Sequence, residues 1–361
     1  MLLLSIGSSN VNAKADYHFG FFIPDDTLFW SRVALFAKSA ANDLNVKITV
    51  FDADANRILM LQQFKKAQKK QSKFDALIFP NFLKTAPIAI KNCEKQQIPC
   101  ILYNGDISED RKHQFSTPGN KYKYWIGQLI PDDQGSAAAI TDALITKARK
   151  VISGPINIVA VNGFNADAPA IKREKGLRNT LQKYPEVNLL QVFYTDWSKE
   201  DAYARTLGFL KRYPKTNVIW SANYRTTNGI LSALFESNKH PGDDVLLNSY
   251  DIDPISLDHI QHDELTVTAG GHYVEGAWAV VMAFDYLKGY KLKIADKTIH
   301  TPLLLVTKEN INLVKNALIQ LEAKPDTLNR ADFSKFSLIN NPNQKHYDFS
   351  LEEILTKIVR H

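Results

Sequence analysis

The sequence predicts an α/β protein built from two doubly wound parallel-sheet lobes. Short runs of β-branched and aromatic residues alternate with longer stretches of helical periodicity, which is the pattern of repeated βαβ units. The alternation pauses in a polar stretch, Ser108 to Lys123, and then begins again. The chain has 361 residues, 45% of them hydrophobic, which is more than one core usually organises, so two domains are expected.

Each predicted lobe has its own series of strands and helices. In the first, the strands are Tyr17 to Phe22, Lys47 to Phe51, Asp75 to Phe79 and Pro99 to Tyr103, and the helices are Leu28 to Leu44, Arg57 to Lys70 and Pro87 to Gln96. A strand-like segment, Tyr124 to Gln128, then leads to Pro131, and the second lobe has strands at Ile156 to Val161, Asn188 to Tyr194, Asn217 to Ser221, Val245 to Ser249 and Leu265 to Ala269. The end of the chain adds a helix at Gly276 to Leu287, a strand at Pro302 to Val306, a helix at Lys308 to Leu321 and an amphipathic stretch at Leu351 to Val359.

Charge and hydropathy exclude two classes of protein. The formal net charge is +6, but Lys and Arg are spread among Asp and Glu along the whole length. A nucleic-acid-binding protein would concentrate its basic residues in an arm or a stripe. Beyond the N-terminus, no stretch approaches the roughly 18 consecutive apolar residues that a membrane span needs. We therefore expect neither a nucleic-acid partner nor a membrane anchor.

The first fifteen residues resemble the rear half of a secretory signal peptide. A short apolar run precedes small residues, with an A-x-A-like end at Ala13 or Ala15. The usual positively charged region is missing, which would follow if Met1 lies inside a longer leader; the alternative is an ordinary apolar N-terminus. We expect an exported protein whose mature chain starts near Lys14 or Asp16.

The sequence contains two cysteines, Cys93 and Cys100. They can form one disulfide in an oxidising compartment, although two buried thiols are the alternative that we favour, because disulfide geometry is restrictive.

Motifs for catalysis, cofactors and metals are missing from the sequence. There is no G-x-S-x-G turn, no P-loop, no H-E-x-x-H and no G-x-G-x-x-G after a strand. Asp52-Ala-Asp54-Ala-Asn56 resembles the opening of a calcium loop, but Arg57 stands where that loop needs Gly and Gln63 where it needs Glu. We expect no enzyme activity, no cofactor and no metal site.

The first candidate ligand-binding motif follows the first strand. A polar turn, Asp25, Asp26 and Thr27, leads to the aromatic pair Phe29 and Trp30 at the start of a helix. Adjacent helical residues point about 100° apart, so both rings do not easily face one core, although core packing is the alternative. Aromatic faces suit the apolar C–H side of a sugar, and polar groups suit its hydroxyls.

A second motif, Asn104-Gly105-Asp106, follows the buried strand that ends at Tyr103. The amide of Asn104 can donate to one hydroxyl and accept from another, and Asp106 is a further candidate. Because Asn-Gly is also a strong turn signal, a purely structural turn is the open alternative.

The second lobe offers a cation and an aromatic ring. Arg173 lies near a predicted helix start, and a planar guanidinium grips two oxygens at once. A solvated charged face is its alternative. Trp197 follows a strand in Thr195-Asp-Trp197. We expect both Arg173 and Trp197 to face the water of an open cleft and to contribute little to either core.

Three more motifs end strands of the second lobe. They place Asn223 with Tyr224, Asp251 with Asp253, and His272 after two glycines. Helix capping is the alternative for both aspartates, and Asp253 is the better cap because Pro254 then occupies the first helical position. A lone His such as His272 is more often an ordinary hydrogen-bonded residue.

These motifs, in this order, resemble those of type I periplasmic binding proteins of the ribose-binding class, with some features closer to the autoinducer-2 receptor. The resemblance covers nearly all of Asp16 to Leu321. It implies that Phe29, Trp30 and Trp197 stack on the ligand, and that Arg173, Asn223 and Asp251 bind it. Ribose-type proteins carry an Asp-Arg pair where this chain has Asn104-Gly105, which argues against ribose and matches the autoinducer-2 receptor better.

Two further departures concern the second lobe. Tyr224 replaces a common Asp. Gly271 stands where the family usually offers Gln and the autoinducer-2 receptor offers Arg, which puts autoinducer-2 itself in doubt unless His272 substitutes.

The resemblance also implies a division of the chain. Two Rossmann-like lobes would be joined by a three-strand hinge near Gln128 to Pro131, Gly270 to His272 and Thr301 to Pro302. Residues 1–15 would be the leader remnant, 16–130 with 271–301 the N-terminal lobe, 131–270 with 302–325 the C-terminal lobe, and 326–361 a C-terminal extension.

The implied function is a soluble periplasmic receptor that closes around a sugar or sugar-like molecule and delivers it to the membrane permease of an ABC importer. The alternative is a sensing subunit whose closed form is read by a membrane kinase or cyclase, suggested by the Asn104 region and by the tail beyond Leu321.

Overall fold

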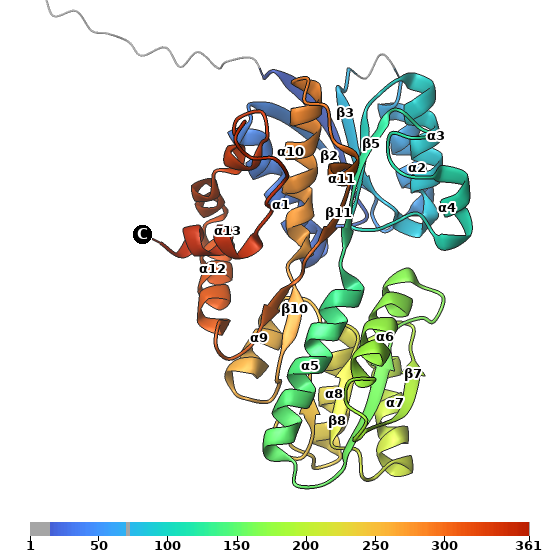
Figure 1. Cartoon of the computed structure of the whole chain (residues 1–361), viewed down its shortest axis with the longest axis vertical. Helices are drawn as coiled ribbons and strands as arrows, with labels where there is room; N and C mark the ends of the chain where they lie inside the picture. The colour runs from blue at the N-terminus through green and yellow to red at the C-terminus, as the bar shows by residue number, and fades with distance from the viewer. Residues whose placement is uncertain (1–14, 70–72, 361) are drawn as a thin grey trace, which may run out of the picture.

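Two parallel sheets organise the chain, for which a computed structural model describes residues 15–69 and 73–360 (Figure 1). The first sheet has six strands in the order β11-β5-β4-β3-β1-β2, all parallel. Its strands are β1 (Tyr17–Ile23), β2 (Val46–Asp52), β3 (Ala76–Pro80), β4 (Cys100–Tyr103), β5 (Trp125–Pro131) and β11 (Thr298–Thr301). Its helices are α1 (Leu28–Asp43), α2 (Arg57–Ala67), η2 (Phe82–Lys84), α3 (Ala86–Gln96), α4 (Glu109–Phe115), α10 (Glu275–Leu287) and α11 (Ile294–Lys297).

Helices cover both faces of this sheet, which explains its nearly continuous apolar strands. Alternate residues of β1 point to opposite faces. Phe19 and Phe21 join the core under α1 and α10, whereas Phe22 joins a second core under α2 and α3.

The second sheet has four parallel strands in the order β7-β6-β8-β9. They are β6 (Ile156–Asn162), β7 (Val187–Tyr194), β8 (Val218–Ser221) and β9 (Leu246–Leu247). The helices are α5 (Asp133–Val151), α6 (Ala168–Leu181), α7 (Lys199–Arg212), α8 (Tyr224–Glu236) and α9 (Pro254–Gln261). Side chains cap several of them: Asn223 Oδ1 accepts from Thr226 N at 2.8 Å.

Three connections join the lobes, which confirms the expected three-strand hinge. The chain passes from β5 directly into α5, from β10 (Thr268–Gly270) through η3 (His272–Val274) into α10, and from β11 into β12 (Leu304–Val306). β10 and β12 form an antiparallel pair, and Asp132 N donates to Thr301 O at 2.9 Å between the first and third connections.

The structure corrects several predicted elements. The strand expected at Leu265 to Ala269 is shorter and pairs with β12, and the polar stretch after Tyr103 contains α4. Cys93 and Cys100 are free, buried thiols, and burial raises the pKa of Cys100 well above its usual value. The alternative without a disulfide therefore holds.

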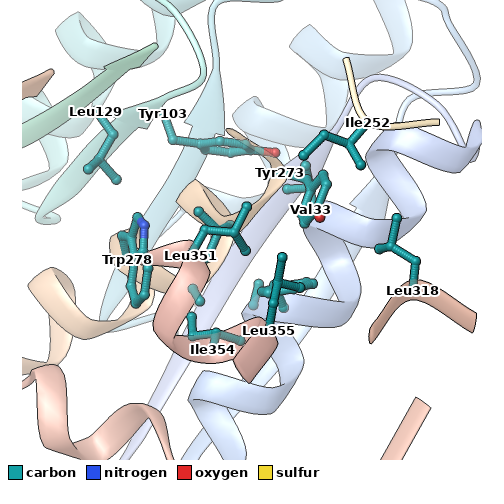
Figure 2. Close-up of a cluster of buried hydrophobic side chains, with 14 of the residues drawn as sticks. Val33, Tyr103, Leu129, Ile252, Tyr273, Trp278, Leu318, Leu351, Ile354 and Leu355 are labelled. Atoms are coloured by element: carbon teal, nitrogen blue, oxygen red, sulfur yellow. The ribbon is translucent and has the colours of Figure 1, made fainter. Parts of the chain in front are cut away.

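The C-terminal extension packs against α1, α10 and α12 (Ile311–Ala323). It consists of η4 (Pro325–Ala331), η5 (Phe333–Phe336) and α13 (Leu351–Val359). Phe349 stacks on Trp278 of α10, with ring centroids 4.4 Å apart. Leu351 packs within the buried cluster shown in Figure 2, so tightly against Gly271 that a Cβ on that glycine would overlap its side chain.

Candidate functional site

A cavity of about 350 Å³ receives residues from both lobes. Its lining comes mostly from segments that follow strand ends, where open α/β sheets place their ligands. The lining residues are Asp25, Thr27, Leu28, Phe29, Trp30, Arg32, Pro169, Arg173, Trp197, Asn223, Tyr224, Arg225, Asp251, Ile252, Asp253, Gly271, His272 and Tyr273.

The first lobe contributes a polar turn and two aromatic rings. Asp25 Oδ1 accepts from the Thr27 backbone N at 3.0 Å, which fixes the turn that leads into α1. Phe29 and Trp30 are half-buried and meet edge to face, with centroids 4.9 Å apart. Both rings line the cavity while packing on the core, so the core and ligand interpretations of these residues are compatible.

Trp197 forms the opposite aromatic wall. Its indole N–H donates to Asp167 Oδ2 at 2.8 Å, and its backbone N donates to Thr195 Oγ1 at 3.2 Å. The ring lies directly on Gly163, where any Cβ would overlap it. The backbone of Trp197 is left-handed, with φ of 69°, so several contacts hold this ring in place.

Arg173 lines the cavity from within the core of the second lobe. Only 7% of the residue is exposed. Its Nε and Nη2 both lie 2.8 Å from Asp133 Oδ1, and Nη1 donates to Ala222 O at 2.6 Å. The guanidinium stacks 3.9 Å from the Tyr250 ring centroid. Burial lowers the pKa of Arg173, but the negative charge of Asp133 has the opposite effect, and the pKa is raised overall. The expectation that Arg173 contributes little to the core is therefore wrong.

Two carboxylates and an imidazole complete the floor. Burial raises the pKa of Asp251 to about 6 although Arg173 lowers it, and burial lowers the pKa of His272 to about 4, so His272 is neutral at pH 7. His272 Nδ1 is buried with no hydrogen-bond partner among the described residues. Asp253 caps α9, since its Oδ1 accepts from Ile255 N and Ser256 N at 3.1 Å, which confirms the predicted cap.

The cavity brings together ten of the thirteen expected site residues. They are Asp25, Thr27, Phe29, Trp30, Arg173, Trp197, Asn223, Tyr224, Asp251 and His272. Three do not line it: Asp26 is exposed, the backbone N of Asn104 donates to Glu275, and Asp106 pairs with Lys112 at 2.8 Å. Ligand contact by any of the thirteen stays a prediction.

Arg225 and Arg32 line the cavity but were not predicted. Arg225 follows Asn223 and Tyr224 in the same motif, and a search for charged neighbours there would have found it. Arg32 lies on the buried face of α1 and donates to Ile252 O at 2.8 Å, a contact 220 residues away in the sequence that no local pattern signals.

Comparison with known proteins identifies the family. Residues 19–291 match the family described as the periplasmic binding protein domain, which is well over half of the chain. This chain belongs to the periplasmic binding protein family.

Several members are similar to this periplasmic binding protein. A crystal structure of a periplasmic sugar-binding protein from Pseudomonas fluorescens matches with a TM-score of 0.79 and 27% identity, over 94% of this chain and 99% of that one. The galactofuranose-binding protein YtfQ of Escherichia coli (strain K12) is 23% identical over 244 residues, 65% of this chain and 68% of its own length.

A third relative shares the fold. The binding protein of the arabinose ABC transporter from Shewanella sp. ANA-3, solved with α- and β-L-arabinofuranose, has a TM-score of 0.70 and 19% identity, over 85% of this chain and 97% of that one. None of these three relatives is an autoinducer-2 receptor or a sensing subunit, so the comparisons support neither that resemblance nor the sensor alternative. The match to the Pseudomonas protein covers 94% of this chain, so it includes part of the C-terminal extension, residues 326–361.

Two properties of the binding protein bear on its location and chemistry. In the described ranges, 15–69 and 73–360, no helix is long and apolar enough to cross a membrane. Within the same ranges, no three His, Cys, Asp or Glu side chains are placed to hold a metal ion. The expected export leader covers residues 1–15, and residues 1–14 of it lie outside the described part of the chain.

Proposed function

We propose that this protein is exported to the periplasm, closes around one neutral monosaccharide, and delivers it to the permease of an ABC importer. The observation that carries the proposal is the cavity itself, with aromatic rings from both lobes and polar groups between them. Phe29 and Trp30 face the ligand space from the first lobe, and Trp197 faces it from the second. Apolar rings with a few placed polar groups are what a sugar requires.

The charges of the lining favour a neutral ligand over a sugar acid. Three cations and three carboxylates line the cavity: Arg32, Arg173, Arg225, Asp25, Asp251 and Asp253. The Arg173 cation is already paired with Asp133, and Arg32 is paired with Glu322 at 2.7 Å. With Asp133 and Glu322 included, five carboxylates stand against three cations around the site, so the local charge disfavours an anionic ligand.

The relatives suggest which ring form is bound. YtfQ is a galactofuranose-binding protein, and the Shewanella protein was solved with arabinofuranose. We infer that the five-membered furanose form of a pentose or hexose is the ligand here as well.

Calorimetry with ring-locked sugars tests this proposal. Methyl arabinofuranosides and galactofuranosides should bind and raise the melting temperature, because a ligand at 100 times its Kd stabilises the folded state by about 2.7 kcal/mol. The matching methyl pyranosides should bind at least tenfold more weakly. Equal binding of both ring forms would overturn the furanose assignment, and no binding of any sugar would overturn the function.

A further inference from the structure

Glu275 is a fully buried carboxylic acid at the hinge. It is the first residue of α10, four residues beyond Gly271, where the chain crosses back into the first lobe, and its relative exposure is 0%. A carboxyl side chain is rarely fully buried unless it is paired with a cation, and no ion pair involving Glu275 occurs among the described residues. The burial of an unpaired carboxyl at this position therefore needs a physical explanation.

The carboxyl joins two segments that are far apart in the sequence. Glu275 Oε2 accepts a 2.6 Å hydrogen bond from the backbone N–H of Asn104, 171 residues away. Asn104 directly follows β4 and has a left-handed conformation, with φ of 52°. This hydrogen bond holds a strained turn of the first sheet against the second hinge crossing, which runs from β10 through η3 into α10.

The same turn leads to the wall of the cavity. Tyr103, next to Asn104, donates to Phe22 O at 2.7 Å and meets the Trp30 ring edge to face, with centroids 6.2 Å apart. On the other side, His272 and Tyr273 precede Glu275 by three and two residues, and both line the cavity. Glu275 thus lies behind both the aromatic wall and the hinge-side floor without touching the cavity.

Three buried polar atoms of this cluster lack hydrogen-bond partners among the described residues. They are Glu275 Oε1, Asn104 Nδ2 and Oγ1 of Thr301, which lies close to Glu275. Buried polar atoms without partners are uncommon in folded proteins, and each one raises the free energy of its conformation. A carboxyl with one free oxygen is better tolerated in the neutral form than as an anion.

The groups around Glu275 also favour its neutral form. Burial raises the pKa of Glu275 to about 8, opposed by the Thr301 hydroxyl and the Asn104 amide and assisted by the negative charge of Asp133. Of the other titratable groups around it, Tyr103 and His272 are neutral at pH 7. The cation on α1, Arg32, donates to Ile252 O and Glu322 instead.

We propose that Glu275 is a positioning residue that, as a neutral acid, holds the Asn104 turn and the second hinge crossing in the geometry that binds ligand. Ionisation of the carboxyl at alkaline pH would place an uncompensated charge in the hinge and weaken binding. The proposal rests on the proposed function, because affinity for the sugar is its main readout.

The experiment compares wild type, Glu275→Gln and Glu275→Leu by calorimetry with a furanoside from pH 6 to 9.5. Glutamine copies the neutral acid and keeps an oxygen for Asn104 N, so its affinity should stay within about threefold of wild type at pH 7. Wild-type affinity should fall about fivefold between pH 8 and pH 9, whereas the Gln variant should stay level. Leucine should weaken binding about tenfold at every pH. Identical pH profiles for wild type and the Gln variant would overturn the proposal, as would wild-type affinity in the Leu variant.

A ligand-free measurement separates this proposal from the proposed function. Because the pKa of Glu275 in the folded protein, about 8, exceeds its ordinary value of 4.5, the stability that Glu275 contributes is present at acid pH and lost as pH rises between these values. As pH rises through this range, the melting temperature of Glu275→Gln should therefore increase relative to that of wild type, even if no sugar binds. If the difference in melting temperature between Glu275→Gln and wild type is the same at every pH, the neutral-acid assignment is overturned. This measurement tests the proposal even if the Leu variant does not fold.

Discussion

Replacing Arg173 with Ala should destabilise the ligand-free protein, because the ion pair with Asp133 is buried. The two side chains are 8% and 7% exposed, and no other cation pairs with Asp133 among the described residues. Breaking a buried ion pair by removing one partner costs about 3 to 5 kcal/mol, since it leaves the other charge without compensation. A folding unit of 150 to 250 residues loses about 2 to 4 °C per kcal/mol, so we expect the melting temperature to fall on the order of 10 °C.

The control removes both charges together. In Arg173→Met combined with Asp133→Leu, no buried charge is left unpaired, so most of the lost stability should return, because apolar replacements of buried pairs are often neutral or better. Differential scanning calorimetry of the apo proteins measures both effects. If Arg173→Ala melts within about 1 °C of wild type, the guanidinium is a solvated cleft group and the buried-pair argument fails.

Three further variants test the aromatic wall and the extension. Trp197→Ala should weaken furanoside binding about tenfold to a hundredfold by calorimetry, through the loss of about 1 to 3 kcal/mol of apolar contact, whereas Tyr194→Ala, outside the cavity, should not. Gly163→Ala should weaken binding to a similar extent because its Cβ displaces the Trp197 ring, and the double variant should be no weaker than Trp197→Ala. Leu351→Ala should lower the free energy of unfolding in urea by about 2 to 5 kcal/mol, while Leu83→Ala, at a side chain 56% exposed, should change it by less than about 0.5 kcal/mol.

Much of the site followed from the sequence because parallel sheets align their carboxyl ends. Polar or aromatic residues directly after a buried strand must lie at one edge, so Asp25, Trp197 and Asn223 could be assigned to the cleft before their contacts were known. The strand and helix alternation was equally readable, since its periodicity is local.

Long-range partners account for what the sequence did not predict. Arg173 carries the same local signal whether it is solvated or buried, and only Asp133, 40 residues earlier, decides between the two. Asn104 was assigned to the ligand, yet its backbone is held by Glu275, which begins a mostly apolar helix and carries no motif. The extension gave an amphipathic stretch but no indication that Leu351 would pack against Gly271 at the hinge.

Three residues at the cleft edges have left-handed backbones. Asn104, Trp197 and Asp251 all follow strand ends of the two sheets and have left-handed backbones, with φ of 52°, 69° and 74°. A left-handed conformation costs a non-glycine residue roughly 1 to 2 kcal/mol, and glycine would remove that cost. Glycine would also remove a ring and a carboxylate from the cavity, and an amide from the turn behind it. Strain of this kind persists where surrounding contacts enforce it, as Glu275 does for Asn104, and it is most easily explained if the side chains themselves are needed.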